Sequence, residues 1–582
     1  MKKYILFAIT LISIFNLSSC DKGWFEPKPL SFYSPDAFKS KEDLDALLLA
    51  ARAGLRNEFQ ARPNRNVTEY YFSDIALGAI WLSNYAHNAE LQVLPTSEPF
   101  NSYMFWYFDN AYAMFKNVNI IISRIDDIEF KEEKEKNEIL AEAYFHRAYH
   151  YYRLVHQFGD VPYIGTEITA PRTDFQSFTR ESILQKIKKD MEFAVEWLPE
   201  KAWGGKVNKA AGYHLLTKIY LSVREFDNAI KAASEVIDSE SYQLMTERFG
   251  NGLYADDPEY NVLWDLHQKE NISIPANKES ILVAQNAYNM EGNGGKSSFN
   301  DVWTPYWRNI PGCEYNLGNG VDEQEAKLGR GNSWVRTCNY FNYDMVGEDP
   351  NDLRYSKHNW FKIEDFYYNQ KESAKYGEKI NPIDVGADTT ATLFPFFYYK
   401  LNVPQETSGN FQGGWIDYYV FRLAETYLLR AEAYWWKGDL ENAAKDVNVL
   451  RSRAKASQKA PSEITIDYIM NERARELYRE EPRKTELTRI AYIMACLGKD
   501  GYSLENMHEK NWYYDKVMRT NNYFRDEIYY GGQYYRIKPY HVYWPIPLTV
   551  IDGNTTNIIN QNLGYAGSEK NIQPKDLITD FD

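Results

Sequence analysis

Apolar residues recur along much of this chain with the period of an α-helix. The pattern is strongest over 136–158, where apolar, aromatic and small residues follow one another at three- and four-residue steps. The repeating positions are Leu140, Tyr144, Arg147, Ala148, Tyr151, Val155 and Phe158. This pattern predicts an amphipathic helix that stops at Gly159, with Pro162 preventing its continuation. A second helix is predicted over 181–198, before Pro199.

Two pairs of helices with matching spacing follow, and their key residues stand where tetratricopeptide-type pairs interlock. These residues are Tyr213, Leu216, Tyr220, Ala229 and Val236 in helices over 209–223 and 227–237, and Tyr427, Ala431, Tyr434, Ala443, Val447 and Leu450 downstream. The small residues let two helices approach closely. We expect tight turns at 225–226 and at 437–439, where Gly438 can adopt a positive φ and Asp439 can cap the next helix.

Between the two pairs lies a long segment, about 246–416, with no sustained helical period. It is rich in Gly, Asn, Trp and Tyr. Long irregular segments on a rigid scaffold are usually where binding happens. The sequence therefore predicts a mainly α fold: tetratricopeptide-like helical pairs at about 40–245 and 417–500 form a scaffold, and 246–416 is a loop-rich insertion that carries short strands and binds the ligand.

The start of the chain is typical of a bacterial lipoprotein signal. Lys2 and Lys3 precede an apolar stretch, and the run 17–20, Leu-Ser-Ser-Cys, ends at Cys20. The apolar stretch is about 12 residues long, whereas a membrane span needs about 20. We therefore expect residues 1–19 to be removed and Cys20 to be acylated, and we reject the alternative of a transmembrane anchor with a chance cysteine.

Composition narrows the possible partners. The formal charge is −15, and it is more negative by two once Lys2 and Lys3 are removed, which argues against nucleic-acid binding. The mean hydropathy of −0.57 is that of a water-soluble body. With 47 Tyr and 15 Trp, the chain has more ring surface than a core requires, so some rings are expected to be exposed and to bind a ligand.

Three cysteines remain beside Cys20. They are Cys313, Cys338 and Cys496, so one disulfide at most can form among them. Cys313 and Cys338 lie in the same loop-rich region and are the preferred pair, with two buried free thiols as the alternative.

Catalytic and metal motifs find no support in the residues. His146 and His150 have the i, i+4 spacing of metal ligands, but no Glu follows His146, so we assign them a core or surface role. Adjacent acids such as Asp256 and Asp257 point apart on a helix or strand; we interpret them as solvated faces, with a structural calcium as the alternative. No cofactor and no enzymatic activity are expected.

Two segments offer the residue types that a sugar site needs. A sugar ring presents an apolar face of C–H groups and a rim of hydroxyls, so it suits flat aromatic platforms flanked by polar side chains. The first segment contributes Tyr71, Asp74, Trp81 and Asn84, and the insertion contributes Trp303, Tyr306, Trp307, Trp334, Arg336 and Trp360. We expect about half of the insertion rings to pack the loops and two or three to be exposed.

Several motifs together resemble the SusD/RagB family of nutrient-binding outer-membrane lipoproteins. They are the lipoprotein signal and the segments 140–149, 158–162, 421–433, 448–454, 472–477, 545–547 and 561–565. The order of these segments matches that of the family, from one end of the chain to the other. The chain departs from the family in two places. In the stretch 481–487, Pro482 stands where the family usually has Gly and Glu486 where it usually has Asp, and we expect a local change of turn there. The second departure is the large, aromatic-rich middle segment, the part of the family that varies most with the ligand.

The resemblance implies one domain over 20–582 on the outer face of the outer membrane. It also implies a SusC-like TonB-dependent transporter as the partner and an oligosaccharide as the ligand. In the starch-binding member a Trp and an Asn three residues later form part of the sugar platform, and Trp81 with Asn84 is similar.

Three other functions remain open from the sequence. A peptide-binding member of the same family would also use an acidic, aromatic cleft. An exported glycosidase would release reducing sugar, and a structural scaffold would bind protein partners alone.

Replacing Cys20 tests the lipid anchor. The Cys20→Ser protein is expected to lose metabolic labelling with radioactive palmitate and to leave the membrane fraction, because each buried methylene of an acyl chain contributes about 0.8 kcal/mol to membrane binding. Cys496→Ser is the control and should remain labelled. Undiminished labelling of the Cys20→Ser protein would contradict the prediction.

Overall fold

The protein is mainly α-helical, as the periodicity predicts, and its strands are short and paired two by two. The computed structural model describes residues 38–582 apart from 61–64, 79–86, 97–100, 204, 253, 289–294, 316–321, 385–396, 405–412, 531–532 and 580–581. Cys20 lies outside these residues. Within the described ranges no helix has the length and apolar character needed to cross a membrane.

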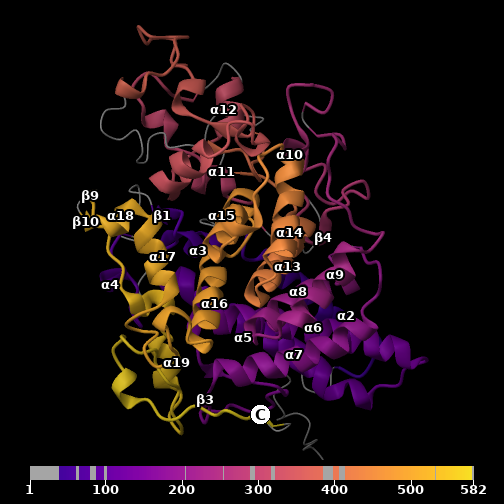
Figure 1. Ribbon diagram of the computed structural model, residues 1–582. Helices are drawn as coiled ribbons and strands as arrows, with labels where there is room; N and C mark the ends of the chain where they lie inside the picture. The colour runs from indigo at the N-terminus through magenta and orange to yellow at the C-terminus, as the bar shows by residue number, and fades with distance from the viewer. Residues whose placement is uncertain are drawn as a thin grey trace, which may run out of the picture.

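The first helical layer lies in the lower part of Figure 1. It consists of α2 (Lys41–Arg56), α5 (Asn101–Arg124), α6 (Glu133–Phe158) and α7 (Arg180–Trp197). Each packs on the next, α2 on α5, α5 on α6 and α6 on α7. The helix α6 ends at Gly159, whose φ of 71° is the positive value expected there. Both predicted helices are confirmed, and each begins slightly earlier than predicted.

The two tetratricopeptide-like pairs form one continuous array. They are α8 (Lys209–Ser222) with α9 (Phe226–Ile237), and α13 (Leu423–Lys437) with α14 (Leu440–Arg453). Although the insertion separates them in sequence, α9 packs directly on α13, where Ala229 and Ala433 are buried. The rings of Phe226 and Trp436 stack across this contact, with centroids 5.8 Å apart. The scaffold therefore runs from α5 to α14 without a break.

The two turns within the pairs differ. Gly438 has a φ of 80° and Asp439 accepts a hydrogen bond from the backbone N–H of Asn442, as predicted. The upstream turn was expected at 225–226, but Arg224 is the residue with a positive φ, 63°, and α9 has already begun at Phe226. A non-glycine residue in this conformation is strained, and the Arg224 guanidinium is held by Glu181 and by the carbonyl of Ser222, each at 2.8 Å.

The remaining helices pack on the array through α15 and α16. They are α15 (Ile466–Leu477), α16 (Arg483–Cys496), α17 (Trp512–Thr520), α18 (Asn522–Arg525) and α19 (Leu548–Gly553), with the short α3 (Thr68–Tyr71) and α4 (Ala89–Gln92) nearby. Of these, α15 packs on α13, and α16 packs on α6, α8 and α17. Pro482 directly precedes α16 and leaves the helix intact, and the expected local change of turn stays a prediction.

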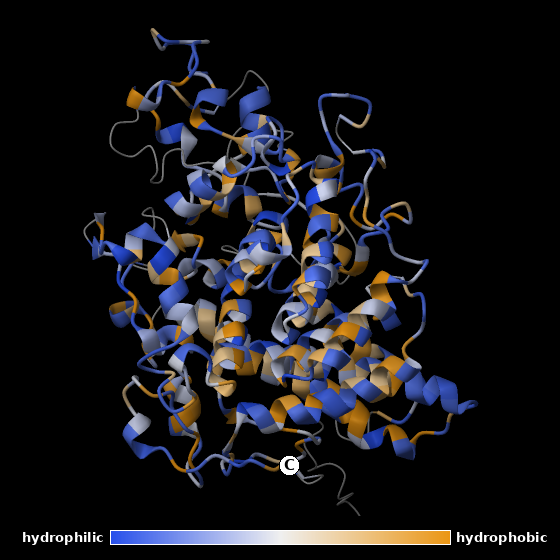
Figure 2. Cartoon of the chain, in the orientation of Figure 1, coloured by the Kyte–Doolittle hydropathy of each residue, from blue (hydrophilic) through white to orange (hydrophobic). Residues whose placement is uncertain are grey.

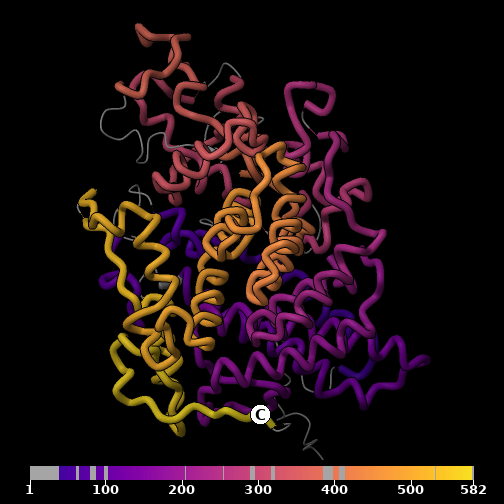
Figure 3. The backbone as a smooth tube through the Cα atoms, viewed as in Figure 1, coloured from indigo at the N-terminus to yellow at the C-terminus, as the bar shows by residue number. Residues whose placement is uncertain are grey.

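The insertion lies at the top of the molecule, above the ends of α13 and α15 (Figure 3). Its helices in the described residues are no longer than six residues: α10 (Val262–Asp265), α11 (Phe299–Val302), α12 (Glu323–Leu328) and a π-helical turn at Tyr340–Met345. Figure 2 shows that its loops are mostly hydrophilic, whereas apolar residues concentrate in the helical layer below. A separate aromatic core supports the loops, with Trp264 stacked on Tyr399 at 4.6 Å.

The strands form short antiparallel pairs, and two of these pairs connect the insertion to the scaffold. The pairs are β1 (Ala76–Gly78) with β5 (Val335–Thr337), β2 (Val161–Pro162) with β3 (Ser177–Phe178), β4 (Ser280–Ala284) with β8 (Tyr418–Arg422), β6 (Trp360–Phe361) with β7 (Phe397–Tyr398), and β9 (Tyr529–Tyr530) with β10 (Gln533–Tyr534). The β4–β8 pair joins a strand from inside the insertion to the segment that leaves it. The β1–β5 pair ties the N-terminal segment to the insertion.

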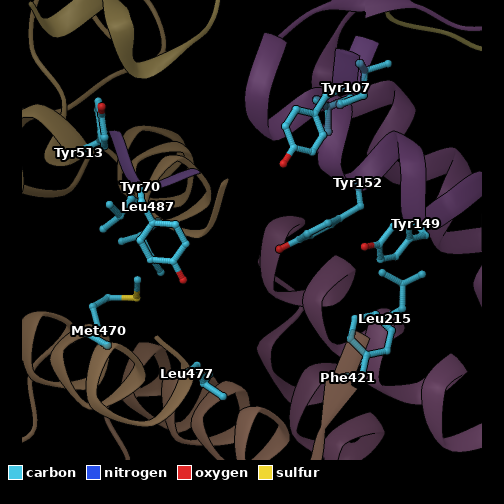
Figure 4. Packing of buried hydrophobic residues seen from close by; sticks show 14 of the residues in the cluster. Tyr70, Tyr107, Tyr149, Tyr152, Leu215, Phe421, Met470, Leu477, Leu487 and Tyr513 are labelled. Carbon is cyan, nitrogen blue, oxygen red and sulfur yellow. The ribbon is translucent and has the colours of Figure 1, made fainter. Parts of the chain in front are cut away.

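The main apolar core lies where these parts meet. Figure 4 shows Tyr149 and Tyr152 of α6 near Leu215 of α8 and Phe421 of β8. All four are buried, and Met470, Leu477 and Leu487 from α15 and α16 belong to the same cluster.

A set of buried ion pairs crosses this core. Arg422 at the end of β8 binds Glu279 at 2.7 Å, Glu476 at 2.9 Å and Glu480 at 2.8 Å, and none of these side chains is more than 5% exposed. Lys400 of the insertion binds Glu480 at 2.5 Å. Burial opposes the charge of Glu476, but Arg453 and Arg422 outweigh it and hold the pKa of that carboxyl well below its usual range.

A second set of ion pairs joins four helices. Lys218 of α8 binds Glu425 of α13 at 2.6 Å and Glu486 of α16 at 3.1 Å. Arg473 of α15 also binds Glu425, at 2.8 Å, and Glu432 binds Arg489 at 2.6 Å. Because a buried charge must be paired, these contacts fix the helices relative to one another.

The predicted disulfide is wrong, and the alternative of free thiols holds. Cys313 is buried in the aromatic core of the insertion, and Cys338 is buried in the main core against the carbonyl of Asp74. The two side chains thus belong to different clusters.

Replacing Arg422 tests the buried ion pairs. Arg422→Met leaves Glu279, Glu476 and Glu480 without their shared partner, so the free energy of unfolding should fall by about 3–5 kcal/mol. Urea denaturation followed by tryptophan fluorescence measures this. The control is Arg172→Met, which breaks the exposed Arg172–Asp174 pair and should have no measurable effect. Equal effects of the two substitutions would contradict the prediction.

Buried histidines predict a loss of stability in mild acid. Burial lowers the pKa of His150 and of His541 to about 3, and that of His87 to about 4. Below about pH 6.5, the ordinary pKa of histidine, these residues take up protons in the unfolded chain but stay neutral in the folded protein. Each therefore lowers the free energy of unfolding by about 1.4 kcal/mol for every pH unit, down to about pH 4. His150→Phe should reduce this slope, which urea denaturation at a series of pH values measures. An unchanged slope in His150→Phe would show that His150 does not contribute.

Candidate ligand-binding surface

A cluster of exposed aromatic side chains lies on the β9–β10 hairpin. Tyr529 pairs with Tyr534, and Tyr530 pairs with Gln533. Opposite residues of an antiparallel pair project from the same face, so Tyr529 and Tyr534 lie together on one face and Tyr530 on the other. Tyr529 is 59% exposed and Tyr534 is 45% exposed, with ring centroids 4.9 Å apart. The hairpin thus presents two adjacent phenol rings to solvent.

Arg336 of β5 supports the hairpin from below. Its guanidinium is buried and lies 4.4 Å from the ring centroid of Tyr523 and 5.6 Å from that of Tyr530. It also donates hydrogen bonds to the hydroxyls of Tyr523, at 3.2 Å, and Tyr535, at 3.4 Å. A planar cation held between phenol rings fixes their orientation.

Further side chains lie beside the hairpin and its support. Arg536 lies over the ring of Tyr534, 4.8 Å from its centroid, and its Nε donates to Glu527 at 2.8 Å. Tyr343, from the π-helical turn, is 48% exposed. Burial and then the neighbouring phenol of Tyr523 raise the pKa of Tyr343. We call the set Tyr343, Tyr529, Tyr530, Tyr534 and Arg536 the tyrosine surface; the hairpin lies at the left edge of Figure 1.

The tyrosine surface adjoins the ends of a segment that the sequence singled out. Trp81 and Asn84 lie outside the described residues. The residues that flank their segment, Gly78 and His87, both contact Tyr535: its hydroxyl donates to the Gly78 carbonyl at 2.9 Å, and its ring lies 4.4 Å from that of His87. Burial and then the Arg336 charge lower the pKa of His87 to about 4, so this ring is neutral at neutral pH.

Two other predicted residues of that region lie in the core. Asp74 is fully buried and accepts from Arg483 through both carboxylate oxygens, at 2.7 and 2.8 Å. Tyr71 is 2% exposed, and burial raises its pKa. Neither side chain is open to a ligand, because α16 packs on α3, which carries Tyr71, and Asp74 is bound by Arg483 of α16 and Thr520 of α17.

The expected exposure of insertion tryptophans is wrong for the described structure. Trp303 packs against Tyr70 and Tyr478, Trp307 lies in the aromatic core of the insertion, and Trp360 packs against Phe341 and Tyr398. All three are at most 4% exposed. Trp307 belongs to the insertion's own core, whereas Trp303 and Trp360 belong to the main core, so packing covers all three rings.

The other predicted insertion residues are placed differently. Tyr306 is half-buried beneath the guanidinium of Arg308, which lies 4.3 Å from its ring centroid. Trp334 directly precedes β5, and it is 8% exposed. The β1–β5 pairing places Val335 opposite Gly78, so Trp334 and Arg336 lie beside the end of β1 from which the chain continues toward Trp81. Of the predicted residues that the structure describes, Trp334 and Arg336 alone are thus brought together near the tyrosine surface.

The hairpin tyrosines were missed by the sequence reasoning, although a signal was present. The run Tyr529-Tyr530-Gly531-Gly532-Gln533-Tyr534 has two glycines between aromatic residues, which is typical of a two-residue β-hairpin. The run is short and follows a helical region, so the pattern did not stand out.

The predicted histidine pair and the cavity at the buried ion pairs offer less to a ligand. Among the described residues no group of three or more His, Cys, Asp or Glu side chains is arranged to hold a metal. His146 and His150 are both buried in α6. The cavity beside Arg422 and Glu425 has a volume of about 30 Å³, which is room for water and not for a sugar ring.

Comparison with known proteins identifies similar chains. The model of the SusD family matches residues 280–565, and a model described as starch-binding, associating with outer membrane, matches residues 24–221. SusD-like protein P25 from Formosa agariphila is 24% identical over 93% of this chain and 95% of its own. SusD-like protein P2 from the same organism is 29% identical over 47% of this chain, and the match spans about half of that relative, 52%.

Among solved structures, one similar chain is surface glycan-binding protein A from Bacteroides thetaiotaomicron in complex with laminarihexaose. The TM-score is 0.62 at 17% identity, over 90% of this chain and 100% of the other. At this identity the similarity shows a shared fold.

Proposed function

Because this chain belongs to the SusD family, we propose that it binds an oligosaccharide at the cell surface and delivers it to a TonB-dependent transporter of the outer membrane. The observation that carries the proposal is the tyrosine surface. Tyr529 and Tyr534 expose neighbouring ring faces on a hairpin that Arg336 holds in place. Flat apolar rings suit the C–H face of a sugar.

Polar groups beside the rings supply what the sugar hydroxyls need. Arg536 has five N–H donors in a planar fork, of which Nε is bound to Glu527. The phenol hydroxyls of the tyrosine surface can donate and accept. We propose that Trp81 and Asn84 extend this platform, since Gly78 and His87 on either side of their segment contact Tyr535.

The anchor and the partner belong to the same proposal. An acylated Cys20 would keep the body beside a transporter in the membrane, facing the cell exterior. The description of the family model that matches residues 24–221 supports association with the outer membrane. The protein would act by binding and release, without catalysis.

Isothermal titration with a panel of oligosaccharides tests the function. The Cys20→Ser protein, which is not acylated, should bind at least one of laminarihexaose, maltohexaose, cellohexaose and xylohexaose. Tyr529→Ala with Tyr534→Ala should weaken that binding by at least about tenfold, or about 1.4 kcal/mol, because the stacking faces are gone. Trp81→Ala should weaken it as well.

The control for this titration is Tyr376→Ala. Tyr376 is 54% exposed in the insertion and lies outside the tyrosine surface, so its loss should not change binding. Binding of short apolar peptides without binding of any sugar would favour a peptide-uptake role instead. Release of reducing sugar would contradict the non-catalytic role.

A further inference from the structure

We infer that the insertion carries a second carbohydrate-binding site, a groove that takes a neutral segment of the same glycan chain. This inference rests on the proposed function and adds a binding site to it. The groove has a volume of about 920 Å³ and is lined by residues 250–252, 254–257 and 268–270 and by Pro404. Pockets of this size accommodate several sugar rings.

The groove is well separated from the tyrosine surface. Its loops flank α10, which Figure 1 places on the opposite side of α15 from β9 and β10. A short oligosaccharide therefore cannot occupy both places, and each can be removed by substitution without touching the other.

A rigid aromatic ring forms part of the groove wall. Tyr254 lines the groove and is partly exposed. Its ring stacks on Tyr260, with centroids 4.5 Å apart and planes 10° apart, and Tyr260 packs against the buried Trp264 at 4.7 Å. Because the stack continues into the core of the insertion, the orientation of the Tyr254 ring is set before any ligand arrives, which lowers the entropy lost on binding.

The backbone of this loop is held in a conformation that a free chain would avoid. Tyr254 has a φ of 64°, which is a strained value for a bulky residue. Arg248 holds the loop: its Nη2 donates to the carbonyl of Tyr254 at 2.8 Å, its Nη1 to that of Asp257 at 2.6 Å, and its Nε binds Asp265 at 2.5 Å. Gly250 also has a positive φ, 77°, and a Cβ there would collide with Asn271.

The polar lining matches sugar hydroxyls and sets a charge preference. Carboxylates come from Asp256, Asp257 and Glu270, an amide from Asn251, and an ammonium from Lys269. Carboxylates and amides accept hydrogen bonds from hydroxyls while the ring packs against Tyr254. With more negative than positive groups, the groove should accept neutral sugars and repel uronic acids or sulfated sugars.

Titration of the Cys20→Ser protein with the neutral hexasaccharides of the panel tests the groove. For the sugar that binds, we expect about two molecules per protein, and about one in either the Tyr254→Ala protein or the Tyr529→Ala, Tyr534→Ala protein. A polysaccharide long enough to reach both places should bind more than about tenfold more tightly than the hexasaccharide, and either variant should abolish this gain.

Two further variants separate a direct role from a loss of structure. Asp256→Asn with Glu270→Gln leaves every ring in place and removes negative charge from the exposed lining. This double variant should bind a galacturonate oligosaccharide in the groove, whereas the parent protein should not. Tyr376→Ala is the control and should retain both sites. Circular dichroism of the Tyr254→Ala protein confirms that it is folded.

Each other outcome has a definite meaning. One binding site in the parent protein, unaffected by Tyr254→Ala, overturns the second site and leaves the proposed function intact. If Tyr254→Ala abolishes binding and the Tyr529→Ala, Tyr534→Ala protein binds as the parent does, the groove is supported and the role of the tyrosine surface is overturned. Absence of binding to every neutral sugar would overturn both.

Discussion

The structure depends on the pairing of charges that are buried where the scaffold and the insertion meet. Arg422 lies at the end of β8, where the chain leaves the insertion, and it binds Glu279 from one side and Glu476 and Glu480 from the other. Lys400 of the insertion shares Glu480. A charge removed from water is tolerated only with a partner, so these residues can be buried only when segments far apart in sequence have come together. The irregular insertion is in this way fixed to α15.

The same requirement positions the tyrosine surface. Arg483 of α16 binds Asp74, which holds the start of β1, and β1 pairs with β5. β5 carries Arg336, whose guanidinium lies between the rings of Tyr523 and Tyr530. A continuous series of contacts therefore runs from the helical scaffold to the exposed hairpin. The proposed groove depends on a comparable arrangement, in which Arg248 and a stack of rings fix Tyr254.

Much of the scaffold could be predicted from the sequence, because helix formation and capping depend on residues within a few positions of one another. The stops at Gly159 and Gly438 illustrate this. The upstream turn was placed late because Arg224, a residue with no preference for a positive φ, takes that conformation with the help of Glu181, 43 residues away. The direct packing of α9 on α13 could not be predicted either, since nothing in a local pattern shows that two pairs separated by the insertion are neighbours.

The sequence by itself determined the helical period, the caps, the family resemblance and the surplus of aromatic residues. Only the tertiary structure decided which of these rings face solvent. Trp307 and Tyr529 are both aromatic residues outside the long helices, yet the first is fully buried and the second is 59% exposed. The difference arises because a ring in a loop is covered by whichever distant segments pack on it, such as Leu328 and Tyr399 in the cluster around Trp307. Periodicity is a property of neighbours in the chain, whereas the exposure of a loop residue is a property of neighbours in space.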